Sequence, residues 1–140
     1  MVRISEKKLI EILQENARLP FVKIAKKLGV SEAAVRKKLS LLEKKGVIKK
    51  YTIEIDPKKL GFEIVCLIGI DTLPEKLISI VEKLVKRKEV KHLYTASGDH
   101  MILIESWFRN SKELTEFIKE LESMKGVTRV CPAIILEKIK

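Results

Sequence analysis

The sequence predicts an α+β protein in which three short helices precede a strand-helix-strand-strand-helix-strand unit. Apolar residues recur at helical spacing through residues 5–46, whereas the second half alternates short apolar strands with two helical segments. Charge divides the chain in the same way. Residues 1–60 hold 16 Lys/Arg against 7 Asp/Glu, and residues 61–140 hold 13 against 12. The 140 residues suit one or two small domains, and only the first half is strongly basic.

The ends of the first three helices are marked by capping residues. Ser5 is a suitable N-cap for a first helix that ends near Asn16. Pro20 suits the first turn of the second helix. Ser31 can cap the third helix, which Gly46 ends after two lysines. The residues expected to form the core of this unit are Leu9, Ile10, Ile12, Leu13, Ile24, Ala25, Leu28, Val35, Leu39 and Leu42.

The second and third helices join at a tight turn over residues 29–31, which predicts a helix-turn-helix. The second helix of that unit fits the major groove of DNA. At 100° per residue, Val35, Leu39 and Leu42 face the core, so small and basic side chains occupy the opposite side. The residues predicted to bind DNA are Ser31, Ala33, Arg36, Lys37, Ser40, Lys44 and Lys49. The alternative is the ordinary solvent-exposed face of an amphipathic helix.

The chemistry of these side chains suggests different contacts. Ala33 can touch a thymine methyl group, and Arg36 or Lys37 can reach guanine. Lys44 and Lys49 are better placed for phosphates.

The segment after the third helix, residues 47–55, alternates weakly and predicts a strand. Asp56-Pro57 closes this strand, and Leu60-Gly61 marks the boundary to the second unit. We therefore expect three parts, namely a helix-turn-helix domain over residues 1–48, a strand and hinge linker over 49–61, and a second domain over 62–140.

The second domain is expected to be a ferredoxin-like βαββαβ sandwich with both helices on one sheet face. The full prediction is thus a winged-type helix-turn-helix followed by this sandwich. Thr72 and Glu75 resemble a capping box for the first helix, and Asn110 with Glu113 starts the second. The helical residues expected in the core are Leu77, Ile78, Val81, Leu84, Val85, Leu114, Phe117, Ile118 and Leu121. The other sheet face also carries apolar residues, which indicates contact with another protein surface.

Several classes of function lack their motifs. Cys66, His92, His100 and Cys131 are the only soft metal ligands, and none has CxxC or HxxxH spacing. No Gly-rich phosphate loop or nucleophile elbow occurs. We expect no enzymatic activity, metal or cofactor. The chain also has no signal peptide and no apolar run of membrane-spanning length, so we expect a cytoplasmic protein with reduced cysteines.

An ordered series of segments along the whole chain resembles the Lrp/AsnC family of regulators. The matching segments are Leu9–Gln14, Asn16–Arg18, Ile24–Ser31, Val35-Arg36, Leu42-Glu43, Gly46–Ile48, Tyr51-Thr52, Asp56-Pro57 and Leu60-Gly61. The resemblance implies an effector-sensing and oligomer-forming second domain. It also implies dimers that often assemble into tetramers or octamers, with the strand over residues 47–55 paired to its copy in the partner.

The same resemblance implies an effector loop between the second and third strands of the second domain. A glycine and a carboxylate there suit a turn that presents backbone N–H groups and one anion to an amino-acid zwitterion. The predicted effector-binding residues are Ser97, Gly98, Asp99, His100 and Met101. Many relatives carry a second aspartate at the position of Met101, so we expect weak binding of polar amino acids or a preference for an apolar side chain. The alternative is a plain hairpin turn.

The predicted function is that of a sequence-specific transcription regulator. It would bind double-stranded DNA as a homodimer, tetramer or octamer, associate with the nucleoid, and respond to an amino acid or related small molecule. The alternative is a non-specific architectural protein that compacts DNA with the same lysines but without base readout. An enzyme built on the second fold would need a catalytic constellation. An RNA-recognition module would need aromatic stacking residues in a Lys/Arg-Gly-Phe-like pattern, which residues 100–108 do not supply.

Overall fold

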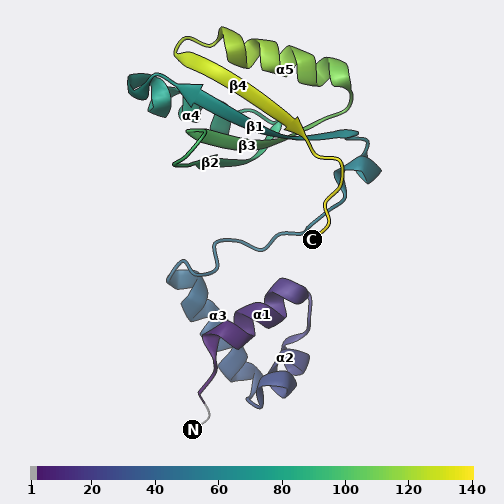
Figure 1. Ribbon diagram of the computed structural model, residues 1–140. Helices are drawn as coiled ribbons and strands as arrows, with labels where there is room; N and C mark the ends of the chain where they lie inside the picture. Colours follow the sequence, from purple (N-terminus) through teal and green to yellow (C-terminus); the bar gives the residue numbers. More distant parts are fainter. Residues whose placement is uncertain (1–2) are drawn as a thin grey trace. The chain divides into compact units, whose positions relative to one another are not determined.

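The computed structural model describes residues 3–140. The chain divides into two compact units, Met1–Glu54 and Ile55–Lys140, each with its own hydrophobic core (Figure 1). The division lies inside the segment predicted to be a linker.

The first unit, called the helical unit below, consists of three α-helices. They are α1 (Glu6–Glu15), α2 (Phe21–Leu28) and α3 (Glu32–Lys44). The hydroxyl oxygens of Ser5 and Ser31 accept hydrogen bonds from backbone N–H groups in the first turns of α1 and α3, over 3.3 and 3.1 Å. Gly29 ends α2 with a left-handed φ of 67°, the conformation that glycine adopts without steric cost. The predicted N-caps Ser5 and Ser31 are therefore confirmed, whereas Pro20, predicted in the first turn of α2, is the N-cap residue just before it.

The core of the helical unit lies where the three helices meet. Its buried residues are Leu9, Leu13, Ile24, Ala25, Val35, Leu39 and Leu42. Ile10, Ile12 and Leu28 were predicted in this core but are only partly buried against it. Ile10 and Ile12 lie at the edges of the apolar stripe of α1, and Leu28 is the last residue of α2, so each keeps some solvent contact. Complete burial of one leucine contributes about 1.5–3 kcal/mol.

Residues 47–55 form no strand within the single chain, and the expected pairing of this segment with its copy in a partner stays a prediction. The N–H groups of Val47 and Ile48 donate instead to the carbonyl of Leu42, over 3.0 and 3.2 Å. The hydroxyl of Tyr51 donates to Glu43 over 2.8 Å. A strand requires a second strand to pair its backbone groups. The one sheet found among residues 3–140 is formed within the second unit, so this segment has no strand beside it.

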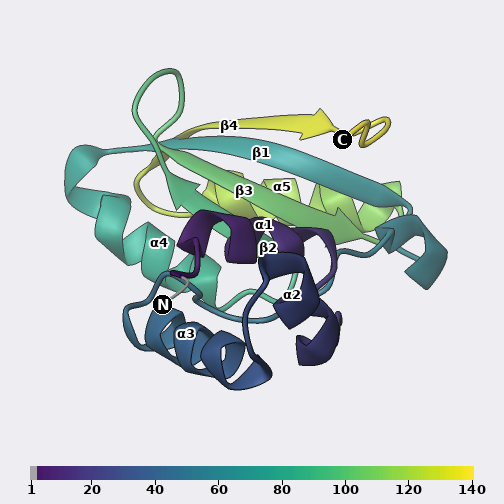
Figure 2. The same ribbon diagram turned by 90° about the horizontal axis from the view of Figure 1, so that it is seen from below.

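The second unit, called the sheet unit below, has the predicted βαββαβ order. Its strands and helices are β1 (Ile64–Thr72), α4 (Leu77–Val85), β2 (Val90–Thr95), β3 (Ile102–Phe108), α5 (Ser111–Ser123) and β4 (Val127–Ile134), with 3₁₀ helices η1 (Pro57–Leu60) and η2 (Pro74–Lys76). The strands form one antiparallel sheet in the order β2-β3-β1-β4 (Figures 1 and 2). Residues of α4 and α5 share a core with the inward side chains of the sheet.

The start of α4 differs from the prediction. Thr72 is the last residue of β1, and its hydroxyl donates to the carbonyl of Leu73 over 2.9 Å. The short helix η2 then precedes α4. The predicted capping box of Thr72 and Glu75 is therefore wrong.

The buried side of α4 also differs from the prediction. Ile80 and Leu84 lie in the core, whereas Ile78 and Val85, predicted there, are 74% and 65% exposed. Residues spaced by three and four positions share a helix face, so burial of Ile80 and Leu84 turns Ile78 and Val85 toward solvent.

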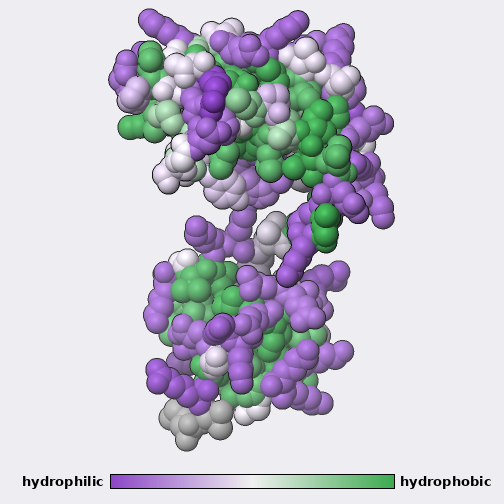
Figure 3. Space-filling model, viewed as in Figure 1, coloured by the Kyte–Doolittle hydropathy of each residue, from purple (hydrophilic) through white to green (hydrophobic). Residues whose placement is uncertain are grey.

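The two faces of the sheet differ in what covers them. Cys66, Ile68 and Ile70 of β1 point into the core with the helices. The alternate residues of β1 point to the other face, called the open sheet face below. Leu67, Leu103 and Tyr94 expose 45%, 39% and 60% of their surface there. Figure 3 shows both hydrophobic and hydrophilic residues on the visible surface of the sheet unit.

Candidate DNA-reading helix and effector loop

The outer side of α3 carries the side chains predicted to bind DNA. Its inner side is fixed by the burial of Val35, Leu39 and Leu42. The exposed residues opposite or beside this inner side are Ala33, Arg36, Lys37, Ser40 and Lys44. Ser31 lies at the N-cap of the same helix, where its hydroxyl oxygen accepts from Ala34 N–H. The structure therefore brings these six predicted residues onto one helix. Lys49 is exposed in the irregular segment beyond it.

Lys38, also on α3, has a partner within the helical unit. Its ammonium lies 2.9 Å from the carboxylate of Glu6 on α1. The hydrogen bond from Lys38 is the main cause that lowers the pKa of Glu6, which therefore stays ionised at neutral pH. This ion pair connects α3 to α1, and it gives Lys38 a partner within the protein.

The predicted effector loop connects β2 to β3 and is anchored at Asp71, near the end of β1. One oxygen of Asp71 accepts from the Met101 N–H over 3.1 Å. The other oxygen lies 3.1 Å from His100 Nδ1 and accepts from Arg129 Nε over 2.9 Å. Asp71 thus holds both the loop and a side chain of β4.

Arg129 closes the loop from the other side. Its Nη2 donates to the backbone carbonyl of Asp99 over 3.0 Å and to the Asp99 carboxylate over 3.2 Å. The Asp99 side chain nevertheless remains 84% exposed. Asp99 was predicted to hold an effector's ammonium group; in the structure this carboxylate already has Arg129 as a cationic partner and keeps most of its surface open to a ligand.

His100 lies on the open sheet face, directly over Gly69 of β1. A Cβ atom at Gly69 would fall on the His100 ring. The missing side chain of Gly69 therefore creates the space that His100 occupies. The predicted loop residues Ser97 and Gly98 are exposed, and Met101 is partly buried against the core.

Gly69, Asp71 and Arg129 are parts of this site that sequence reasoning missed. Asp71 and Arg129 are 58 residues apart and meet because they are direct partners in the β1–β4 ladder. The register of the β1–β4 ladder is the signal that would have identified Asp71 and Arg129. Neither of these two residues stands in a recognisable sequence motif. The register itself follows from how the core packs.

The pH dependence of the loop follows from Asp71. Burial acts to raise the pKa of Asp71, but hydrogen bonds from His100, Arg129 and the Met101 N–H outweigh burial and lower it below its ordinary value of 3.8. The ionised Asp71 carboxylate therefore contributes fully to loop stability above pH 3.8. This contribution is lost as the pH falls through the lower pKa that Asp71 has in the folded protein. We expect the Met101 amide NMR signal to titrate with a midpoint below pH 3.8. Asp71→Asn should abolish this titration, and a midpoint above 3.8 would contradict the assignment.

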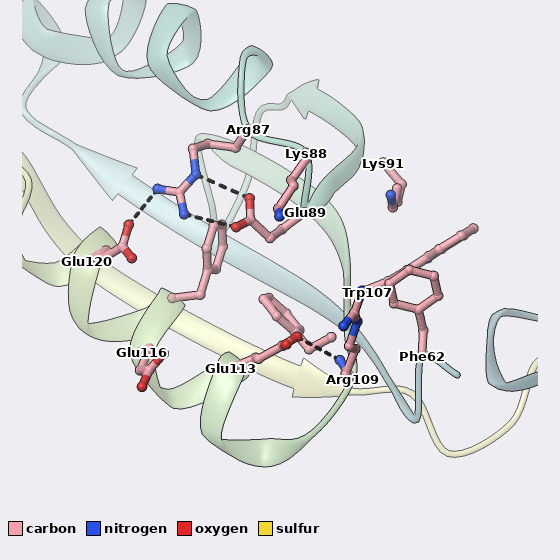
Figure 4. Close-up of a pocket in the computed structure, with 12 residues that line it drawn as sticks. Phe62, Arg87, Lys88, Glu89, Lys91, Trp107, Arg109, Glu113, Glu116 and Glu120 are labelled. Atoms are coloured by element: carbon pink, nitrogen blue, oxygen red, sulfur yellow. Dashed lines mark hydrogen bonds and ion pairs between the residues drawn. The ribbon is translucent and has the colours of Figure 1, made fainter. Parts of the chain in front are cut away.

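A separate shallow cavity of about 370 Å³ lies between α5 and the adjoining ends of β2 and β3 (Figure 4). Several of its polar groups pair with one another. Arg87 donates to Glu89 over 3.2 Å and to Glu120 over 2.6 Å, and its guanidinium lies 5.0 Å from the centroid of the Phe117 ring. These contacts connect α5 to the loop before β2, so we interpret the cluster as structural.

Other features of the described residues bear on the predicted chemistry. No group of three or more His, Cys, Asp or Glu side chains suited to a metal occurs within residues 3–140. Cys66 is buried, and burial raises the pKa of its thiol. Across the same residues, no helix has the length and apolar character needed to cross a membrane.

Comparison with known proteins finds a matching family model for each of the two units. Residues 3–49 match the family model of the winged helix-turn-helix DNA-binding domain, and residues 65–140 match that of the Lrp/AsnC ligand binding domain. The HTH-type transcriptional regulator LrpA of Pyrococcus horikoshii is 51% identical over 141 aligned positions and matches along 100% of both chains.

Solved structures share the same fold. AsnC of E. coli has a TM-score of 0.81 at 26% identity, over 94% of this chain and 90% of that one. A transcriptional regulator of Neisseria meningitidis in complex with L-methionine has a TM-score of 0.88 at 21% identity, over 99% and 93%.

A helix-turn-helix unit joined to a ligand-binding sheet unit defines a sequence-specific transcription regulator that a ligand modulates. The chain belongs to the Lrp/AsnC family.

Proposed function

We propose that this regulator reads its operator with the outer side of α3 and that an amino acid bound at the loop between β2 and β3 changes its affinity for DNA or its assembly. The observation that carries the first part is the set of small and basic side chains exposed on α3 opposite its buried leucines. Small residues permit close approach to the groove, and the basic ones supply donors to base edges and phosphates.

Base readout and phosphate contact have different experimental signatures. Arg36 lies one turn from the start of α3 and can form a bidentate contact with guanine, worth about 1–3 kcal/mol of discrimination. Lys44 lies in the last turn, where a phosphate contact is favoured. We expect Arg36→Ala to lower the ratio of operator to random-sequence affinity at least about fivefold. Lys44→Ala should weaken binding to all sequences alike and reduce the salt slope by about 1.

The operator for these measurements would come from selection of bound DNA in a random pool. An enriched pseudo-palindrome supports a symmetric regulator, because a two-fold protein reads two-fold DNA. The rival function is non-specific compaction of DNA, and a pool without enrichment would favour it. In either case the DNA-bound protein would be associated with the nucleoid in the cytoplasm.

Support for an amino-acid effector comes from the geometry of the loop. A zwitterion needs an anion for its ammonium and donors for its carboxylate. The exposed Asp99 carboxylate and the backbone N–H groups beside Gly98 offer both. The methionine complex of the Neisseria protein fits an apolar effector side chain. Here Met101, rather than a second carboxylate, follows His100, which favours the same preference.

Calorimetry with a panel of amino acids tests this part. We expect heat from apolar amino acids with the wild-type protein and a much weaker signal with Asp99→Ala. Identical heat from both proteins would mean that the loop is only a turn. Binding that changes neither DNA affinity nor assembly would not be regulation, because a ligand acts only through unequal affinity for two states.

We further propose that the open sheet face mediates a homodimer or a larger homo-oligomer. Leu67, Leu103 and Tyr94 are apolar or aromatic and are exposed on this face in the single chain. Light scattering on the full chain should give at least twice the mass of one chain. Leu67→Glu combined with Leu103→Glu should give the mass of one chain, and a monomeric wild type at micromolar concentration would refute the proposal.

A further inference from the structure

Arg36 differs from the other exposed cations of α3 in lying on an aromatic ring. Its guanidinium carbon is 5.2 Å from the centroid of the Phe21 ring, within the range of a cation–π contact. Phe21 is the first residue of α2 and is partly buried against the core of the helical unit. One aromatic ring thus connects that core to a guanidinium on the outer surface of α3.

This contact restrains the Arg36 side chain and leaves its hydrogen-bond donors unoccupied by the ring. A guanidinium stacks through its flat face, and its five N–H groups point outward in the plane of the fork. An ion pair has the opposite effect, as Lys38 illustrates by donating to Glu6 at 2.9 Å. Among these two neighbouring cations, Arg36 is the one that is both held in place and able to donate to another molecule.

Restraint of this kind matters most for a geometrically demanding contact. A free arginine loses rotamer freedom when it binds, and a side chain that is already ordered loses less. A bidentate contact with a base edge requires the fork to lie at one angle, whereas a phosphate accepts donors from many directions. Loss of the restraint should therefore affect discrimination between sequences more than overall attraction to DNA.

We propose that Phe21 is a positioning residue for sequence discrimination. Its ring holds the guanidinium of Arg36 at the angle needed for a base edge, and Phe21 itself touches no base. This inference rests on the proposed role of the outer side of α3 and adds a residue of α2 that no groove-facing pattern on α3 would identify.

The test compares variants that distinguish the effect of the aromatic face of Phe21 from the effect of its apolar side-chain volume. Phe21→Leu keeps an apolar side chain in the core but removes the aromatic face, and Phe21→Tyr keeps that face. Val22→Ala is the matched control, because Val22 is the next residue of α2 and is 50% exposed. Each protein is titrated with its selected operator and with random duplex at several salt concentrations, and its melting temperature is measured.

We expect Phe21→Leu to lower the ratio of operator to random affinity by about two- to fivefold, the size of a partly exposed cation–π contact. Random-duplex affinity and the salt slope should stay unchanged, and Phe21→Tyr and Val22→Ala should retain the wild-type ratio. In an Arg36→Ala background, Phe21→Leu should have no further effect on the ratio, because the residue it positions is absent. A purely structural role would lower both affinities together with the melting temperature in either background.

Three results would overturn the inference. The first is an unchanged ratio of operator to random-duplex affinity in Phe21→Leu. The second is an equal loss of affinity for operator and random DNA. The third is the same loss of the affinity ratio when Phe21→Leu is made in the Arg36→Ala background. Failure of the underlying function is distinguishable, because a wild-type protein without any operator preference would refute sequence-specific reading itself.

Discussion

Leu42→Ala should unfold the helical unit and abolish DNA binding while the sheet unit stays folded. Leu42 is 0% exposed at the centre of that core, and its carbonyl accepts the N–H groups of Val47 and Ile48. Truncation of a buried leucine costs about 2–5 kcal/mol, and a unit of this size has little more stability than that to lose. The two units have separate cores, so the loss should not spread.

Thermal melts followed by NMR would measure this effect unit by unit. The signals of residues 55–140 should keep their dispersion in Leu42→Ala, and those of the helical unit should collapse. Leu41→Ala is the control, since Leu41 is the adjacent leucine of α3 and is 40% exposed. Loss of both sets of signals in Leu42→Ala would show that the units fold as one.

Gly69→Ala should displace His100 and weaken amino-acid binding at the loop. The new methyl group would occupy the position of the His100 ring, so the ring must leave the sheet and its contact with Asp71 must break. Overpacking of this kind typically costs about 1–3 kcal/mol. Because Met101 is held by the same aspartate, we expect the loop to lose order and its effector affinity to fall.

Calorimetry and thermal unfolding would follow this variant together. Adding His100→Ala to Gly69→Ala removes the clashing ring and should recover the lost stability without recovering ligand affinity. His100→Ala alone serves as the control, because it removes the same ring without adding a methyl group in its place. Wild-type affinity in Gly69→Ala would contradict the role assigned to His100.

The amino-acid sequence alone determined the order of elements and which side of α3 faces outward. Capping residues at Ser5, Ser31 and Asn110 predicted helix starts that the structure has, because an N-cap is a local interaction within four residues. The outer side of α3 followed from periodicity, since burial of Val35 and Leu39 leaves one possible exposed side.

The predictions from which the single chain departs depended on non-local contacts. A strand over residues 47–55 needs a pairing strand, which the described single chain lacks. The buried face of α4 depended on how the helix packs against the sheet, because the apolar residues of Leu77–Val85 cover more than one helix face.

Only the tertiary structure decided how the loop between β2 and β3 is held. The resemblance to the Lrp/AsnC family pointed to Asp99 and His100, because it implies an effector loop at these positions. Sequence reasoning missed Asp71, Gly69 and Arg129, which reach the loop through the register of three strands. Likewise, α3's own pattern showed Arg36 exposed, but only the packing of α2 against α3 put the Phe21 ring beneath it. Local interactions such as caps and turns depend on neighbouring residues and can be predicted from the sequence. Contacts between distant residues form only once a core has packed and set the register of its strands and helices.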